Sequence, residues 1–178
     1  LYVRKATLEY LASARYDEQL HIGMRLLKLG RTSMTLQGCA FRGEKPLVHG
    51  EIVYVFADPA TQTSRPIPQA LKDVMHAFEA GETMFSIATG TWDAMSAEAA
   101  PLRHAVFVQE QEVPEELEWD ADDAASLHAV ARNRLGQAVG TGRLLPASEG
   151  ISKIGRMAVM PTVRGAGVGR SVLRALLA

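Results

Sequence analysis

A glycine-rich turn near the carboxyl end of the chain constrains the fold more than any other feature of the sequence. Glycines stand at positions 165, 167 and 169, after a segment at 153–159 that reads as a strand. From Val168 onward the sequence reads as a helix. Because glycine tolerates backbone conformations that other residues avoid, this spacing indicates a sharp turn. The sequence therefore predicts a strand, a glycine-rich turn and a helix in that order.

Such a turn is suited to holding a phosphate group. Without side chains at the start of a helix, successive backbone N–H groups can approach an anion, and the helix dipole adds partial positive charge. Arg164 and Arg170 flank the turn and could donate charge-assisted hydrogen bonds to phosphate. We therefore expect a pyrophosphate to fit here.

Two other phosphate-binding motifs are excluded by their spacing. A Walker A loop needs Gly-Lys before its Ser or Thr, whereas Gly169-Arg170 precedes Ser171 without a lysine. The dinucleotide fingerprint, counted from Gly165 and Gly167, requires a third glycine where Arg170 stands.

The segment resembles the GNAT superfamily of N-acyltransferases. Their phosphate motif is Arg or Gln, two residues, Gly, one residue, and Gly or Ala, and Arg164, Gly167 and Gly169 fill it. Upstream, the stretch at 102–111, followed by Val113-Pro114 and Glu118-Trp119-Asp120, resembles the first helix and following loop of one GNAT subgroup. The resemblance covers Met84 to Ala178.

The resemblance implies that the chain uses acetyl-CoA or another acyl-CoA as substrate, without a metal. In that family the turn holds the CoA pyrophosphate, and the preceding strand lends its main chain to the pantetheine arm. The implied cofactor-binding residues are Met157, Ala158, Val159, Arg164, Gly165, Ala166, Gly167, Val168, Gly169 and Arg170.

The implied reaction is direct transfer of the acyl group to a small-molecule or protein amine. A strand N–H near Val159 would polarise the thioester carbonyl. A carboxylate could serve as base, and Glu110 and Glu112 are the candidates, against a role as helix-end surface acids. The tyrosine that often serves as general acid belongs to a later unit, and because the chain starts at Leu1 and stops inside a predicted helix, we expect it to be a fragment.

The first half is predicted to consist of antiparallel strands. Its residues from Tyr2 to Ala57 alternate in long hairpins, and an amphipathic helix follows, with Gly81 as its stop. Four segments resemble the later strands of hotdog-fold acyl-CoA thioesterases of the 4-hydroxybenzoyl-CoA type: 3–10, 14–20, 30–33 and 65–68.

That family wraps its sheet around a central helix preceded by a catalytic Asp, and neither lies in this sequence. Asp17 and Asp58 are therefore not assigned as replacements. By resemblance, Arg31, Ser33 and Arg65 are candidates for the CoA entrance, with turn or surface roles as the alternative. Hotdog sites form between paired subunits, so a homodimer or higher homo-oligomer is implied.

The predicted fold class is α+β: a hotdog-type sheet domain at 1–80 followed by a GNAT-type mixed α/β domain at 83–178. Within the second domain, Ser96 is predicted to cap a helix at 97–109. The run at 112–123 holds seven carboxylates and is interpreted as a solvated surface loop. In the first domain, Cys39 is interpreted as a buried core thiol.

Composition excludes several classes of function. The net charge is −1 and no basic run is interleaved with aromatic residues, so a nucleic-acid partner is not expected. No apolar run approaches the roughly 20 residues that span a bilayer. The five histidines lack metal-ligand spacing. A single cysteine fits a reducing compartment, and we expect the cytoplasm.

The leading hypothesis is a bifunctional acyl-CoA enzyme, in which the hotdog half hydrolyses thioesters and the GNAT half transfers acyl groups. One alternative is a GNAT enzyme with a non-catalytic hotdog module for dimerisation or acyl binding. Another is an acyl-CoA sensor that binds without turnover.

Overall fold

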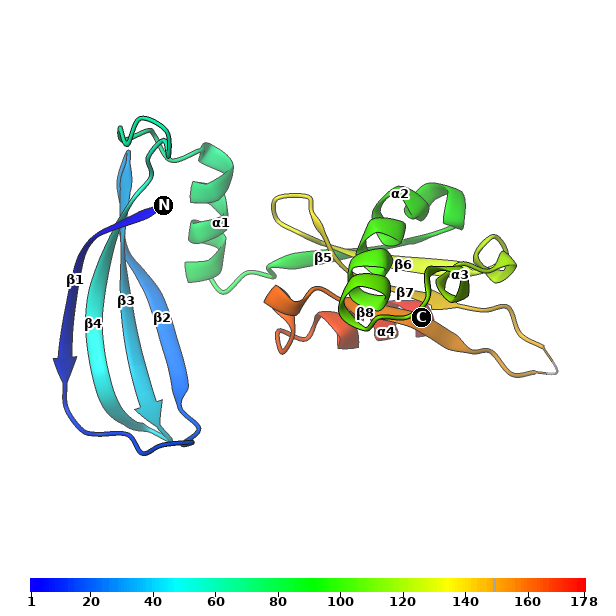
Figure 1. The fold of residues 1–178 in the computed structure, drawn as a ribbon, viewed down its shortest axis with the longest axis horizontal. Helices are drawn as coiled ribbons and strands as arrows, with labels where there is room; N and C mark the ends of the chain where they lie inside the picture. Colours follow the sequence, from blue (N-terminus) through cyan, green and yellow to red (C-terminus); the bar gives the residue numbers. More distant parts are fainter. Residues whose placement is uncertain (149) are drawn as a thin grey trace. The chain divides into compact units, whose positions relative to one another are not determined.

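The computed structural model describes residues 1–148 and 150–178. The chain divides into two compact units, Leu1–Glu82 and Thr83–Ala178, and each contains a four-stranded sheet. All neighbouring strands are antiparallel, and helices accompany both sheets (Figure 1). The α+β class predicted from the sequence is confirmed.

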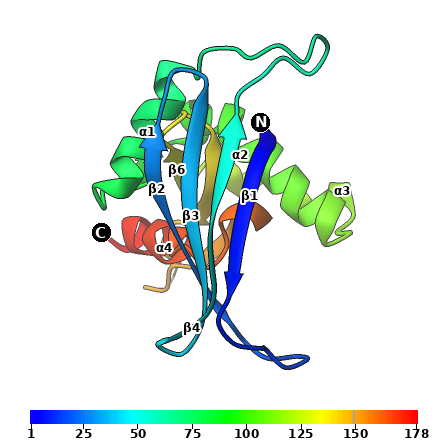
Figure 2. The same ribbon diagram turned by 90° about the vertical axis from the view of Figure 1, so that its left-hand side faces the viewer.

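The first unit is built from long hairpins. Its strands are β1 (Tyr2–Tyr10), β2 (His21–Leu29), β3 (Ser33–Arg42) and β4 (Lys45–Val55), in the sheet order β1-β4-β3-β2. Figure 2 shows the four strands side by side. Long alternating stretches joined by short turns favour this arrangement, because each strand can pair with the strand that follows it.

The two faces of this sheet differ in polarity. Residues directly opposite in an antiparallel sheet share a face, so the pairings Leu8↔Gly50, Gly50↔Gly38 and Gly38↔Met24 form one row across the strands. Apolar side chains on this face remain exposed: Leu8 by 51%, Met24 by 50% and Ile22 by 68%. The described part of the chain therefore leaves this apolar face open around Leu8, Ile22 and Met24, whereas Met34 on the same face is buried.

The opposite face carries polar side chains and the chain's cysteine. Glu9, His49, Cys39 and Gly23 follow one another across the sheet, and His49 Nε2 lies 2.9 Å from Glu9 Oε2. Cys39 is only half-buried, so its predicted burial in a core is wrong. The physical reason is its position: it faces away from the apolar side, and the glycine opposite has no side chain to cover it.

One helix completes the first unit. Helix α1 (Gln69–Glu79) lies near β2, and the Leu26 backbone N–H donates to Glu79 Oε1 at 2.5 Å. Gly81 follows the helix with φ +69°, the left-handed conformation that ends many helices. The stop predicted from the sequence thus agrees with the backbone.

The second unit is a meander with helices on both faces. In chain order its elements are β5 (Phe85–Gly90), α2 (Trp92–Arg103), the π-helix η1 (His104–Glu110), α3 (Glu115–Glu118), η2 (Ala121–Asp123), β6 (Leu127–Asn133), β7 (Ala138–Leu144), β8 (Ile154–Val159), η3 (Pro161–Val163) and α4 (Val168–Leu177). The sheet order is β5-β6-β7-β8.

Helix α2 begins earlier than predicted. Thr91 is extended at φ −70° and ψ 164°, and its carbonyl accepts the backbone N–H groups of Ala94 and Met95 at 3.1 Å. Ser96 lies inside the helix, so its assignment as the cap is wrong. The buried Met95 packs with Val130 of β6, and this contact requires the first turn that the sequence alone did not reveal.

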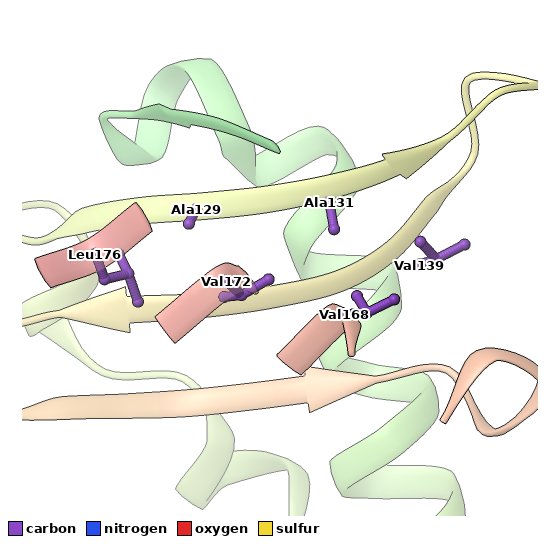
Figure 3. Packing of buried hydrophobic residues seen from close by; sticks show 6 residues of the cluster. All are labelled: Ala129, Ala131, Val139, Val168, Val172 and Leu176. Carbon is purple, nitrogen blue, oxygen red and sulfur yellow. The ribbon is translucent and has the colours of Figure 1, made fainter. Parts of the chain in front are cut away.

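Helix α4 covers one face of the second sheet and α2 covers the other. Alternate residues of a strand face opposite sides: Ala129 and Ala131 pack with α4, whereas Val130 packs with α2. Figure 3 shows the α4 side, where the strand residues Ala129, Ala131 and Val139 meet the helix residues Val168, Val172 and Leu176.

Two glycines of β7 set how closely α4 approaches the sheet. A Cβ at Gly140 would lie 2.6 Å from Val168 Cγ1, and one at Gly142 would lie 2.4 Å from Met157 Sδ and 3.0 Å from Val172 Cγ1. The 2.6 Å separation is shorter than real Cβ contacts, so a side chain at Gly140 would displace the start of α4, whereas one at Gly142 would first displace Met157 of β8 and press on Val172. The start of α4 therefore lies close to the sheet because β7 lacks side chains there.

The described helices include none that is long and apolar enough to cross a bilayer. Within the same residues, no group of three or more His, Cys, Asp or Glu side chains is placed to hold a metal ion.

Candidate functional site

The glycine-rich turn joins β8 to α4 and leaves open space above its backbone. Gly165 and Gly167 have φ of +84° and +83°, and a Cβ at either position would meet no atom within 4 Å. L-amino acids with side chains rarely adopt this conformation. The turn therefore needs glycine at both positions.

The start of α4 presents backbone N–H groups without helical partners. The first bond of the helix runs from the Ser171 N–H to the Gly167 carbonyl at 3.0 Å. The N–H groups of Val168, Gly169 and Arg170 precede it and cannot bond within the helix. They lie at the positive end of the helix dipole, which favours an anion at this position.

Strand β8 lies at the edge of the sheet, beside the turn. The Met160 N–H donates toward β7, to Val139 O at 3.0 Å. Because successive peptide groups of a strand point in opposite directions, the N–H and the carbonyl of Val159 face the open edge. The carbonyl accepts from Arg164 Nε at 2.9 Å. The predicted site residues at 159 and 164–170 are therefore neighbours in space.

A bulge interrupts the pairing of β8 with β7 at Arg156. The register shifts between Thr141 and Arg143, and Arg156 has φ +50°, which costs a non-glycine residue about 1–2 kcal/mol. Its guanidinium is anchored by the preceding loop: Nε donates to Glu118 O at 3.1 Å and Nη2 to Asp120 Oδ2 at 3.0 Å. These contacts hold the bulge and re-aim the end of the strand.

The two candidate bases lie in different surroundings. Glu110 forms a bidentate pair with Arg164, with both N–O distances at 2.6 Å. The hydrogen bond from Arg164 lowers the pKa of the Glu110 carboxyl below its ordinary value, and Glu110 in turn raises the pKa of Arg164. Glu112 is exposed, has φ +56°, and its side chain forms no hydrogen bond or ion pair within the described residues.

The acidic run at 112–123 is not simply a solvated loop. Glu118 and Asp123 are only 2% and 4% exposed, so the prediction is wrong for both. Arg103, itself 1% exposed, donates from Nε to Glu118 Oε1 at 2.5 Å and from Nη1 to Asp123 Oδ1 at 2.7 Å. Arg143 donates to the same Asp123 oxygen at 2.7 Å. A buried ionic network therefore underlies the loop.

Aromatic rings complete this network. The Arg103 guanidinium carbon lies 5.2 Å from the ring of Trp92 and 5.0 Å from that of Trp119, within the range of cation–π attraction. Asp120 is the more exposed partner of Arg143 in this network. The hydrogen bond from Arg143 lowers the pKa of Asp120, and the same bond raises the pKa of Arg143. The network fixes the loop against β7 and β8, the strand beside the turn.

The thioesterase-type candidates of the first unit have structural partners. The backbone of Arg31 accepts from the Ile67 N–H at 2.8 Å, and Gly30 N donates to Ser33 O at 2.8 Å. Arg65 forms an ion pair with Asp58, whose carboxylate also accepts from the Ala60 N–H at 2.8 Å. These contacts support turn roles for all of them.

Both halves of the chain match protein families. Residues 91–178 match the acetyltransferase (GNAT) family, and residues 1–49 match the thioesterase superfamily. The two matches fall on the halves for which the sequence predicts them, and the predicted combination is confirmed.

Solved structures of both kinds are similar to parts of the chain. They include a thioesterase from Thermus thermophilus complexed with coenzyme A and Zn (22% identity, 44% of this chain and 59% of that chain, TM-score 0.41). A candidate N-acetyltransferase from Lactobacillus plantarum is 31% identical over 52% of this chain and 64% of that chain, with a TM-score of 0.47. A GNAT-family acetyltransferase from Staphylococcus aureus is 16% identical over 52% and 63%, with a TM-score of 0.43. The chain spans about three fifths of the length of these structures.

Proposed function

We propose, from the union of a thioesterase-type segment with a GNAT domain in one chain, that the protein is a bifunctional acyl-CoA enzyme. The second unit binds an acyl-CoA and transfers its acyl group to an amine. The first unit contributes to hydrolysis of acyl-CoA thioesters and pairs with a second copy. Both units then handle the same class of substrate.

The observation that carries the transferase function is the open glycine turn beside the edge of β8. The free N–H groups at the start of α4 suit the pyrophosphate of CoA, and the missing Cβ atoms at 165 and 167 leave room for it. The side chain of Arg170 is exposed next to this position. The outward N–H of Val159 suits a carbonyl of the extended pantetheine arm or of the thioester. The residues present therefore fit an acyl-CoA.

The chemistry required of the chain is mainly positioning. The amine nitrogen attacks the thioester carbonyl, a C–N bond forms, the C–S bond breaks, and CoA leaves as a thiolate that takes up a proton. An N–H directed at the carbonyl oxygen stabilises the charge that develops there. The amine must also lose a proton, and Glu112, whose carboxylate has no partner within the described residues, is the candidate base that we favour to accept it through water.

One alternative for the first unit has its own support. Asp58 is held by Arg65 and the Ala60 N–H, and Asp17 is exposed at φ +58°. Neither has the surroundings of a nucleophile or a base, and one face of the sheet is apolar and open. The exposed apolar side chains of this face suit a dimerising or acyl-binding module, which would leave the transferase as the chain's single activity.

The test measures thiol release from a panel of acyl-CoAs, with and without pooled amines, for the wild type and Gly167→Glu. We expect amine-dependent release that Gly167→Glu abolishes, because the new carboxylate fills the turn and repels phosphate. Gly136→Glu is the matched control, since Gly136 has φ +80° and open space above it but lies between β6 and β7.

Three outcomes are informative. Amine-independent release that survives Gly167→Glu would support a working thioesterase unit. Absence of amine-independent release would favour a first unit that serves only as a dimerising or acyl-binding module. CoA affinity that is equal in Gly167→Glu and Gly136→Glu would refute the assignment of the site.

A further inference from the structure

We infer that Glu110 is a positioning residue that orders the phosphate turn through Arg164, and that it is not the base of the transfer reaction. This role rests on the proposed acyl-CoA site, whose pyrophosphate end it serves.

The Arg164 guanidinium is a junction between three segments of the unit. Its Nε donates to Val159 O at the end of β8, and its Nη1 and Nη2 donate to the two oxygens of Glu110 at the end of η1. Arg164 itself begins the glycine turn. A pair separated by 54 residues in sequence therefore fixes the first residue of the turn relative to both the strand and the π-helix.

The same contacts make Glu110 unsuited to accept a proton from an amine. Both carboxylate oxygens are occupied by one guanidinium, in the paired geometry that makes Arg–carboxylate bonds strong. The lowered pKa of Glu110 acts in the same direction, because a carboxylate that binds protons weakly is a poor general base near neutral pH. Glu110 is also bonded to Arg164, the first residue of the phosphate turn.

Ordering matters here because two of the three residues after Arg164 are glycines. Glycine loses more backbone entropy on ordering than any other residue, and Gly165 and Gly167 both lie in this turn. A turn that is held at its first residue before binding has less entropy to lose when phosphate arrives. Glu110 should therefore affect the affinity for acyl-CoA, with little effect on turnover of the bound complex.

The experiment compares Glu110→Gln, Arg164→Lys and the double variant. CoA affinity is measured by calorimetry, and kcat and KM by steady-state transfer. Because the pair is exposed by 43% and 39%, its loss should leave the unit folded. We expect each single change to raise the Kd for CoA and the KM for acyl-CoA by roughly threefold to tenfold, with kcat within about twofold. The Kd for CoA of the double variant should be no higher than the higher of the two single-variant values.

The matched control is Glu98→Gln. Glu98 forms a bidentate pair with Arg132, at 2.6 and 2.5 Å, between α2 and β6. Its loss removes a similar charge and a similar pair from the same unit without touching the turn. We expect Kd, KM and kcat to remain those of the wild type.

Several results would overturn the inference. A fall in kcat of roughly a hundredfold with unchanged Kd would make Glu110 the base. Additive effects in the double variant would mean that the two residues act separately, and tighter CoA binding by Glu110→Gln would mean that the carboxylate competes with phosphate. If the wild type binds CoA and Glu110→Gln has the same Kd, the positioning role is refuted and the proposed function is not. A wild type that does not bind CoA would refute the proposed function itself.

Discussion

Asp123→Asn should destabilise the second unit strongly, because this carboxylate serves two buried arginines. One oxygen of Asp123 accepts from both Arg103 and Arg143 at 2.7 Å, and all three side chains are at most 6% exposed. Asparagine keeps the shape of the side chain and removes its charge. The substitution therefore isolates the electrostatic part of the network.

The expected magnitude follows from the charge balance of the network. Its cations are Arg103, Arg143 and Arg156, and its anions are Glu118, Asp120 and Asp123. The variant leaves one cation without a counter-charge. Breaking one side of a buried ion pair costs about 3–5 kcal/mol. For a unit of this size that corresponds to a decrease in Tm of roughly 12 °C or more.

The chain contains its own probe for this experiment. Its two tryptophans, Trp92 and Trp119, both flank Arg103, so tryptophan fluorescence during urea unfolding reports on the second unit. Glu116→Gln is the matched control, because Glu116 belongs to the same acidic run but is exposed, and its effect should stay within about 0.5 kcal/mol. Equal urea midpoints for the two variants would refute the view that the buried ions stabilise the unit as a network.

Two further predictions concern backbone strain and an ion pair. Arg156→Gly and Arg156→Ala lose the same contacts to the acidic run, but only glycine relaxes the φ of +50°, so the glycine variant should be more stable by about 1 kcal/mol in urea unfolding. Equal stabilities would contradict strain at this bulge. In the first unit, the hydrogen bond from Arg42 lowers the pKa of Glu18 from 4.5 to about 2. Because the folded pKa is lowered, the stabilisation is present above pH 4.5 and is lost as the pH falls toward 2. The carboxyl carbon of Glu18 should therefore titrate near pH 2 by NMR, and at a higher pH in Arg42→Ala, which keeps only the backbone hydrogen bond from Arg15; a wild-type midpoint at the ordinary value would contradict the pairing.

Features with local causes could be predicted from the sequence. Helix α4 begins at Val168, as predicted, because the glycines before it determine the turn from within the segment itself. The hairpins of the first unit follow from alternation and short turns in the same way. The end of the last strand differs by only two residues: β4 ends at Val55, whereas the sequence predicts the hairpins to extend to Ala57.

Features with distant causes could not be predicted. The burial of Glu118 depends on Arg103, which lies 15 residues away and becomes its neighbour only when the unit folds. A run of carboxylates ordinarily indicates solvation, and a lone arginine in a helix gives no sign of a partner. Trp119, directly after Glu118, was the one local hint that this run contacts a core. The pairing of Glu110 with Arg164 spans 54 residues and gives no local sign either.

Because α4 lies close to β7, we expect substitutions in β7, as well as in the turn, to alter ligand preference. Gly140 and Gly142 contribute no atoms to the turn, yet they allow the close approach of the helix whose first N–H groups form the proposed phosphate site. Mutagenesis confined to positions 164–170 would vary the turn itself and leave the position of the helix unchanged. A larger residue at Gly140 would instead move the start of the helix. For directed evolution of substrate scope, these two strand glycines are therefore the positions to keep constant in a first library and to vary in a second.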